Sequence, residues 1–441
     1  MNSKTKHIFY IVGLVISVIS VMPFMPTVLK YLIAIFPVLL FGADLTLKYM
    51  QGFFNKRFIN RNLAGILAGL GLIVTGKIGY AAITMLLFSA SDFYLDMLID
   101  ISRRRIEDSS RVTAPYATVL ANGKALRVSP ASVVVGQTLV LREGDIIPCD
   151  CVAVSGEGLI DYTNIFGNGE PRNAKAGSNC FSGGIVQQGA LSVRAVKSAK
   201  DSLNAVVNAY TKKASKPSKS QKTIEIISAV YEAAVYPFSF FIFLIFWLFT
   251  KDFALAVHQS AALLVLSSMI SITKLLPLLS RNALLCGRRK GVIFTDIASL
   301  ERCGNIKTVS ANEEVSEDVL AMIEEAGAVP AKGGYTKDDA VLYRNRGILE
   351  SDENPCFKLA LGFFSPKAQA TALDSKPQRS AGAVSTGRSY KQALRINLAC
   401  IIAQKLAMVA LIFLFNISPV TAVIIDFAAC LFCLYNSTKE I

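Results

Sequence analysis

The 441-residue chain is 52% hydrophobic and only 18% charged, a balance too apolar for a soluble protein of this length. Its net charge of +14 would suit nucleic acid, but the basic residues stand beside apolar runs, as at residues 103–105 and 288–290. Basic clusters of this kind are typical of the cytoplasmic ends of membrane-spanning helices. We therefore expect a multi-pass membrane protein that contacts the lipid bilayer and binds no nucleic acid.

Four apolar runs in the first hundred residues predict two out-and-back pairs of membrane helices. They cover about 7–27, 32–49, 63–74 and 80–99. The first run follows Lys4 and Lys6, as in a signal peptide, but no small-residue cleavage site precedes the second run, so we interpret it as a spanning helix. The basic residues Lys56, Arg57 and Arg61 should then lie in the cytoplasm.

The character of the chain changes after residue 112, where short β-branched runs alternate with turn residues up to about 198. The stretch TVLANGKALRVS predicts a hairpin around Asn122 and Gly123. No run in this part is long enough to span a bilayer, so we expect a small cytoplasmic β domain. A link at 201–222, first helical and then rich in Lys and Ser, leads back to the membrane.

The second half of the chain alternates again between apolar and mixed segments. The remaining apolar runs lie at about 229–249, 254–285, 394–415 and 420–434. Pro277 should break the second of these. The intervening hundred residues show helical spacing at 317–326 and loop-like composition at 332–347 and 373–388, and they can hold one small domain. Eight spans would place both termini in the cytoplasm.

These patterns predict a polytopic α-helical membrane protein with about eight transmembrane helices and two cytoplasmic insertions. The expected order is helices one to four, the β domain with its link, helices five and six, a small α/β domain, and helices seven and eight. The corresponding boundaries are 1–105, 106–222, 223–286, 287–392 and 393–441.

Three stretches of the chain carry patterns of one family. The first stretch resembles the actuator domain of the heavy-metal-transporting P-type ATPases. The residues that fall on that domain's pattern are Gly136, Gly144, Pro148, Asp150, Asp161, Gly167, Pro171, Gly177 and Gly183. The segment RRKGVIFTDIASLERCGNIKTV, at 288–309, resembles the family's run into its phosphorylation site. The last two helices are similar to those of the zinc, cadmium and lead branch, where Lys405 and Asp426 match a lysine and an aspartate in type and separation. The resemblance implies a β-rich actuator domain and, at 287–392, a reduced α/β phosphorylation domain.

The phosphorylation site departs from the family pattern. The family carries an Asp-Lys-Thr-Gly-Thr loop whose aspartate attacks ATP, and the counterpart here begins at Asn312. An amide is a poor nucleophile and a weak magnesium ligand. Glu313 would take the role only after a one-residue slip, without the lysine and threonines that hold the phosphate. The Asp-Gly dipeptide of the family's magnesium hinge is also absent from the sequence.

The actuator domain departs in the same direction. The family's glutamate that positions the hydrolytic water aligns with Asn168, and Glu170 is out of register by two residues. About a hundred residues at 287–392 cannot hold a nucleotide-binding insert together with a full phosphorylation domain. The resemblance therefore implies a truncated and catalytically degenerate relative, for which we expect no catalytic residue and no bound ATP or magnesium.

The ion path implied by the resemblance is altered as well. The family's Cys-Pro-Cys motif aligns with residues 268–270, where Met269 is either a soft-metal ligand or a core-filling side chain. Asp426 and Lys405 are either a remnant of the cation site, with the lysine as an internal counter-ion, or a salt bridge between the last two helices.

The cysteines offer weaker candidate sites. Cys430 and Cys433, at i and i+3, share a helix face and either bind a soft metal or pack as small residues. Cys149 and Cys151 share a strand face but have no evident further ligand. Nine scattered cysteines form no disulfide framework.

The sequence therefore predicts a pseudo-ATPase of the plasma membrane with a regulatory or metal-binding role. Its expected partner is a functional metal ATPase or another membrane protein, and its expected metal is a divalent cation such as zinc. Two alternatives stay open. One is a divergent ATP-driven metal transporter whose nucleotide domain another chain supplies, and the other is a passive cation pathway through the remaining helices.

Overall fold

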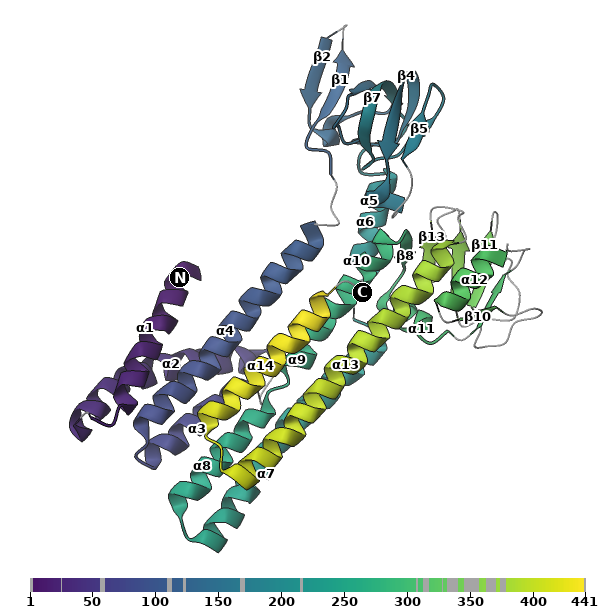
Figure 1. The fold of residues 1–441 in the computed structure, drawn as a ribbon. Coiled ribbons are helices and arrows are strands. Elements are labelled where there is room, and N and C mark those ends of the chain that lie inside the picture. Colours follow the sequence, from purple (N-terminus) through teal and green to yellow (C-terminus); the bar gives the residue numbers. More distant parts are fainter. Residues whose placement is uncertain are drawn as a thin grey trace. The chain divides into compact units, whose positions relative to one another are not determined.

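In the computed structural model, the chain divides into two compact units that alternate along the sequence (Figure 1). The first comprises Met1–Ser102, Ser220–Leu278 and Leu394–Lys439, and the second comprises Arg103–Lys219, Leu279–Ala393 and Glu440–Ile441. The structure describes all residues except 1–2, 25, 56–59, 109–112, 122–123, 167–170, 215–216, 307, 312–316, 327, 331–339, 345–356, 362–369, 373–377 and 440–441.

Apolar helices make up the first unit. Five helices in the described part of the chain are long and apolar enough to cross a bilayer: α2 (Thr27–Phe54), α4 (Ile78–Asp108), α7 (Lys219–Thr250), α13 (Gln378–Phe415) and α14 (Pro419–Thr438). The shorter apolar helices are α1 (Ser3–Val21), α3 (Arg61–Val74) and α8 (Phe253–Leu264). All eight helices fall on the predicted apolar runs. Because three of them are shorter than a bilayer-spanning helix usually is, the total of eight spans stays a prediction.

The sixth apolar run does not form one continuous helix. After α8 come a 3₁₀ turn at Val265–Ser267, two non-helical residues and the short helix α9 (Ile270–Thr273), and α10 (Leu275–Arg289) begins after Lys274. The prediction of a break at Pro277 itself is wrong, because Pro277 lies in the first turn of α10, where its missing N–H has no intrahelical partner to lose. Its ring would clash with a helical carbonyl at Thr273, so the interruption falls before it.

Small residues bring α3 and α4 into close contact. Ala64 and Ala68 on α3 are fully buried, and a Cβ added at Gly69 would lie 2.2 Å from the side chain of Met85 on α4. Backbones can approach this closely only where side chains are small. The packing sets the first turn of α3 beside Ser91 and Asp92 of α4, where the charged residues described below meet.

The predicted β domain is present as a seven-stranded sheet. Its strands are β1 (Ala117–Ala121), β2 (Lys124–Val128), β3 (Thr138–Leu141), β4 (Cys151–Asp161), β5 (Arg172–Ala174), β6 (Asn179–Cys180) and β7 (Ile185–Ala195). Their order is β2-β1-β3-β7-β4-β5, with β6 on β4, and every pairing is antiparallel. The hairpin predicted around Asn122 and Gly123 is confirmed, because Ala121 pairs with Lys124. The link that follows is α6 (Leu203–Ala214) and the start of α7.

A second sheet follows α10. It contains β8 (Val292–Phe294), β9 (Thr308–Ala311), β10 (Val329–Pro330), β11 (Ala340–Arg344), β12 (Phe357–Leu361) and β13 (Ala370–Ala372), in the order β10-β9-β11-β12-β13-β8. β8 is antiparallel to β13, and the other pairings are parallel. The helices α11 (Ile297–Cys303) and α12 (Glu317–Glu325) lie between its first strands in sequence.

Two segments predicted as loop contain regular structure. Residues 332–347 include β11, and residues 373–388 include the start of α13 at Gln378. Glycines suggested a loop in the second case, but they serve helix packing: a Cβ at Gly387 would lie 2.6 Å from the backbone nitrogen of Gly304. The helix can approach the end of α11 only because that position has no side chain.

Candidate functional site

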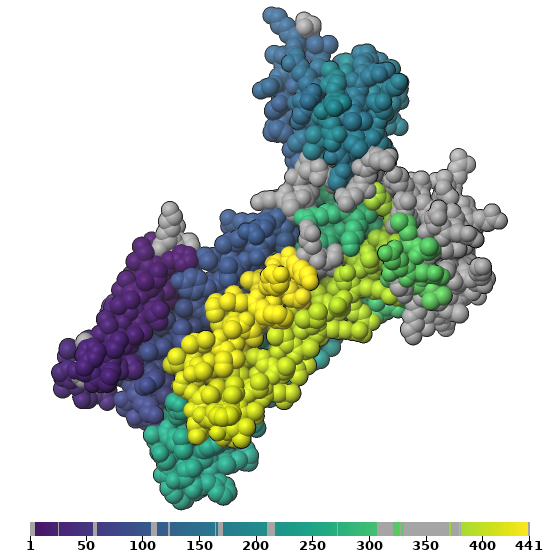
Figure 2. All heavy atoms as spheres, in the orientation of Figure 1, coloured from purple at the N-terminus to yellow at the C-terminus, as the bar shows by residue number. Residues whose placement is uncertain are grey.

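A buried ion pair joins the last two helices. Lys405 Nζ on α13 donates to Asp426 Oδ1 on α14 at 2.9 Å, and the two side chains are 11% and 4% exposed. α13 (yellow-green) and α14 (yellow) lie side by side in Figure 2, which agrees with this contact. Because a charge at membrane depth needs a partner, the pairing stabilises both residues. A role for the pair in cation binding stays a prediction.

Arg61 extends this pair into a larger cluster. The first residue of α3, it donates through Nη1 to Asp92 Oδ1 on α4 and through Nη2 to Ser91 Oγ at 2.7 Å. The same Nη2 lies 3.9 Å from Asp426 Oδ2. Arg61 is 6% exposed, so its side chain lies within the helix bundle, and the cytoplasmic position of this basic segment stays a prediction. The side chain of Asn60 caps the N-terminus of α3, so the helix begins at Arg61 and this residue belongs to α3 rather than to the preceding basic run.

The four charges alternate in sign and cancel. Asp92, Arg61, Asp426 and Lys405 come from α4, α3, α14 and α13, and each contacts the next. Isolated charges in an apolar core would each cost roughly several kcal/mol, whereas a neutral, well-paired set is tolerated. Asp426 Oδ2 still has no hydrogen-bond partner among the described residues.

The broken sixth run lies against the helices of this cluster. Its 3₁₀ turn packs against α3 and α14, and α9 packs against α14. Met269 precedes α9 and is 9% exposed, so its thioether is within the core. Ser268 Oγ is buried and has no hydrogen-bond partner among the described residues. The oxygen ligands that this segment presents include the Ser268 hydroxyl and backbone carbonyls, in place of the thiolates of a Cys-Pro-Cys motif.

The cysteines of α14 are buried, but they do not complete a metal site. Cys430 is 4% exposed and Cys433 is fully buried, with its Sγ 3.9 Å from the carbonyl oxygen of Asn397. In the part of the chain that the structure describes, no three His, Cys, Asp or Glu side chains are grouped so that they could hold a metal ion. The predicted soft-metal role of Cys430 and Cys433 therefore has no third ligand there.

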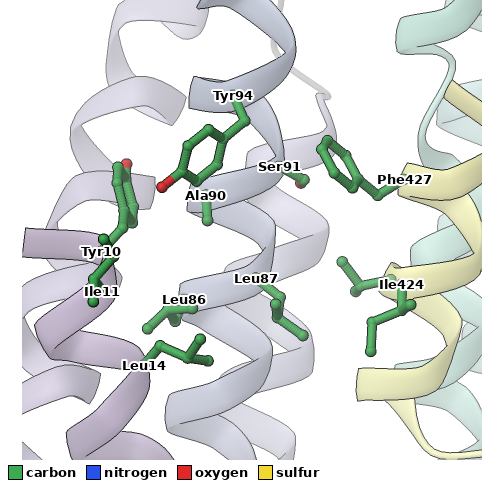
Figure 3. Close-up of a pocket in the computed structure, with 11 residues that line it drawn as sticks. Tyr10, Ile11, Leu14, Leu86, Leu87, Ala90, Ser91, Tyr94, Ile424 and Phe427 are labelled. Atoms are coloured by element: carbon green, nitrogen blue, oxygen red, sulfur yellow. The ribbon is translucent and has the colours of Figure 1, made fainter. Parts of the chain in front are cut away.

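An apolar pocket of about 250 Å³ lies between α1, α4 and α14 (Figure 3). It is lined by Tyr10, Ile11, Leu14, Leu86, Leu87, Ala90, Ser91, Tyr94, Val423, Ile424 and Phe427. The hydroxyl of Ser91 contacts Arg61, and Phe427 follows Asp426 in α14, so the pocket adjoins the charged cluster. Its lining is almost wholly hydrocarbon and would not solvate an ion.

The β domain identifies the chain's relatives. A family model described as the P-type ATPase actuator domain matches residues 111–210. The cadmium, zinc and cobalt-transporting ATPase of Helicobacter felis is 23% identical over 304 residues, which cover 68% of this chain and 44% of that protein. The zinc-transporting ATPase of Synechocystis sp. is 25% identical over 57% of this chain and 36% of its own. The chain is thus similar to heavy-metal P-type ATPases, and residues 111–210 match their actuator domain.

The similarity to solved structures is low. A crystal structure of a zinc-transporting PIB-type ATPase has a TM-score of 0.46 and 13% sequence identity, with 98% of this chain and 99% of that chain covered. The chain spans about half the length of the curated heavy-metal P-type ATPases that it matches.

The two residues that the sequence predicts to stand in place of the family's catalytic acids adjoin described elements. Asn312 directly follows β9, and Asn168 comes two residues after the short helix α5 (Thr163–Phe166). Both lie outside the described residues. β9 has β10 on one side and β11 on the other, so its carboxyl end is a switch point of the parallel sheet, the place where α/β proteins bind ligands.

Three buried thiols lie in the actuator-like domain. Cys149 Sγ is 3.6 Å from Cys151 Sγ, and Cys151 pairs across the strands with Cys180. The hydrogen bond with Cys149 and burial raise the pKa of the Cys151 thiol, and burial raises the pKa of the Cys180 thiol. Protonated thiols are poor metal ligands, which favours a packing role for Cys151 and Cys180.

Arg61, Ser91 and Asp92 are the residues of the cluster that the sequence did not single out. Asp92 could have signalled the site, because it is an acid within the fourth apolar run and such a residue needs a partner. Arg61 gave a weaker signal, since it stands near Lys56 and Arg57, where positive-inside topology explains any basic residue.

Proposed function

We propose that the chain is a pseudo-ATPase of the heavy-metal P-type family, a membrane protein that forms no aspartyl phosphate and acts by binding or regulation. The observation that carries this proposal is that β9 ends at a switch point of the second sheet, and that the next residue in the sequence, which the resemblance aligns with the family's phosphorylated aspartate, is Asn312. An amide there supplies neither the attacking oxygen nor the anionic magnesium ligand that phosphoryl transfer needs.

The regulatory role would act on the handling of a divalent metal cation such as zinc, in line with what the relatives' names say they transport. A functional metal ATPase of the same membrane is the partner we propose, because the helices and the actuator-like domain would offer it matching surfaces. We place the chain in the plasma membrane with both termini in the cytoplasm.

A phosphoenzyme assay tests the proposal. The purified full chain is incubated with ATP labelled in the γ-phosphate, magnesium and zinc, and is then quenched with acid; an active zinc-transporting ATPase prepared in the same way is the positive control. We expect no acid-stable label on the chain. Label that disappears in Asn312→Ala, or in Glu313→Gln, would instead establish a divergent ATP-driven transporter and identify the residue that is phosphorylated.

A further inference from the structure

The Arg61 guanidinium lies between two carboxylates of the membrane unit. It hydrogen-bonds Asp92 through Nη1, and its Nη2 lies 3.9 Å from Asp426 Oδ2. The ring of Phe88 faces the guanidinium at 5.1 Å, and Arg61 Nε has no hydrogen-bond partner among the described residues. A cation therefore already occupies the space between the acids of α4 and α14, and it is attached to α3.

The charge balance decides what else this space can hold. Two acids and two bases give the cluster no net charge, and a divalent ion added to it would leave two positive charges in an apolar core. Without Arg61 the three remaining groups carry one negative charge, so a divalent ion would leave a single positive charge. Without Arg61 and Lys405 the two carboxylates would neutralise the ion completely.

The groups around Arg61 are suitable ligands once the guanidinium is removed. Asp92 and Asp426 present carboxylate oxygens, and Ser91 presents a hydroxyl that now accepts a hydrogen bond from Arg61. Carboxylate oxygen is a common zinc ligand.

We infer that Arg61 is a tethered cation that closes a latent divalent-metal site at the two carboxylates of Asp92 and Asp426, beside the hydroxyl of Ser91. In the natural chain the guanidinium takes the place of a metal ion and holds α3, α4 and α14 together. The membrane unit then binds no divalent ion at Asp426, whatever happens at Asn312. The inference thus goes beyond the proposed function and does not depend on it.

Zinc stoichiometry measured on the purified full chain tests this. The protein in detergent is dialysed to equilibrium against zinc, and bound zinc per chain is measured by atomic emission. We expect Arg61→Ala to bind about one zinc ion more than the natural chain, and Arg61→Ala with Asp426→Asn to lose that ion again. Arg61→Lys keeps the charge and should bind no extra zinc, whereas Arg61→Ala with Lys405→Ala should bind the extra ion more tightly than Arg61→Ala alone.

A charge-balanced variant keeps the test decisive if Arg61→Ala does not fold. Lys405→Met with Asp426→Asn removes one complete ion pair, and we expect it to bind as much zinc as the natural chain. Lower binding by that variant would show that Asp426 already holds zinc beside Arg61 and would overturn the inference. So would a folded Arg61→Ala protein that gains no zinc. The zinc-binding assay contains no ATP. A negative result in it would therefore overturn this inference without bearing on whether the chain forms a phosphoenzyme.

Discussion

At the scale of single residues, charge inside an apolar run was the informative signal. Lys405 and Asp426 could be paired from sequence because both stand in spanning segments joined by a short connection. The other half of the cluster could not be assembled in this way. Arg61 and Asp92 are 31 positions apart on two helices, and their contact depends on how closely α3 and α4 pack, which hydropathy does not report.

The buried pair of Arg61 and Asp92 should affect stability far more than an exposed pair does. Asp92→Asn leaves the guanidinium undercompensated and should lower the free energy of unfolding by about 3–5 kcal/mol. Arg61→Met with Asp92→Leu removes both charges and should cost much less. The measurement is unfolding in mixed detergent micelles.

The matched control is Asp96→Asn on the same helix. Asp96 pairs with Lys274 at 2.6 Å, but the side chains are 56% and 37% exposed, so we expect a change within about 1 kcal/mol. If Asp92→Asn were no more destabilising than Asp96→Asn, the buried cluster would not stabilise the bundle.

At the scale of elements, the family pattern in the β domain has a physical basis. Gly136, Gly144, Gly177 and Gly183 all have positive φ, a conformation that glycine adopts without strain. Gly156 and Gly189 also have positive φ but were not singled out from sequence. Their role depends on the register of β4 against β7, where the strands are irregularly paired, and no local pattern reveals that register.

Gly156→Ala should destabilise the β domain more than Gly136→Ala does. Both glycines have φ near +90°, but a Cβ at Gly156 would lie 2.3 Å from the carbonyl oxygen of Ala190, whereas nothing lies within 4 Å of one at Gly136. Backbone strain alone should cost about 1 kcal/mol at Gly136, and the added clash should raise the cost to roughly 3 kcal/mol at Gly156. Hydrogen exchange of the β4 and β7 amides in the full chain measures the difference. Equal protection in the two variants would contradict the close approach of β4 and β7 at Gly156.

At the scale of the whole molecule, hydropathy predicted the alternation of membrane helices and polar insertions. The second insertion was harder, because strands of two to five residues separated by long connections leave no periodic signal. The helices of the first unit carry large apolar side chains on their exposed faces, such as Phe249, Leu406 and Leu414, which are 84%, 67% and 73% exposed. Contact with lipid explains this surface.

The distribution of basic residues predicts the orientation in the membrane. Clusters at 103–105 and 288–290 lie at the ends of α4 and α10, whereas the connection between α7 and α8 carries Lys251 and Asp252, with no net charge. We expect alkaline phosphatase fused after Lys251 to be active, and the same enzyme fused after Ile441 to be inactive, because an odd number of spans should separate the two fusion sites. Green fluorescent protein at Ile441 should fluoresce and provides the matched control for expression. An active phosphatase at Ile441 would place the end of α14 outside the cell and would mean that the number of spans between the two sites is even.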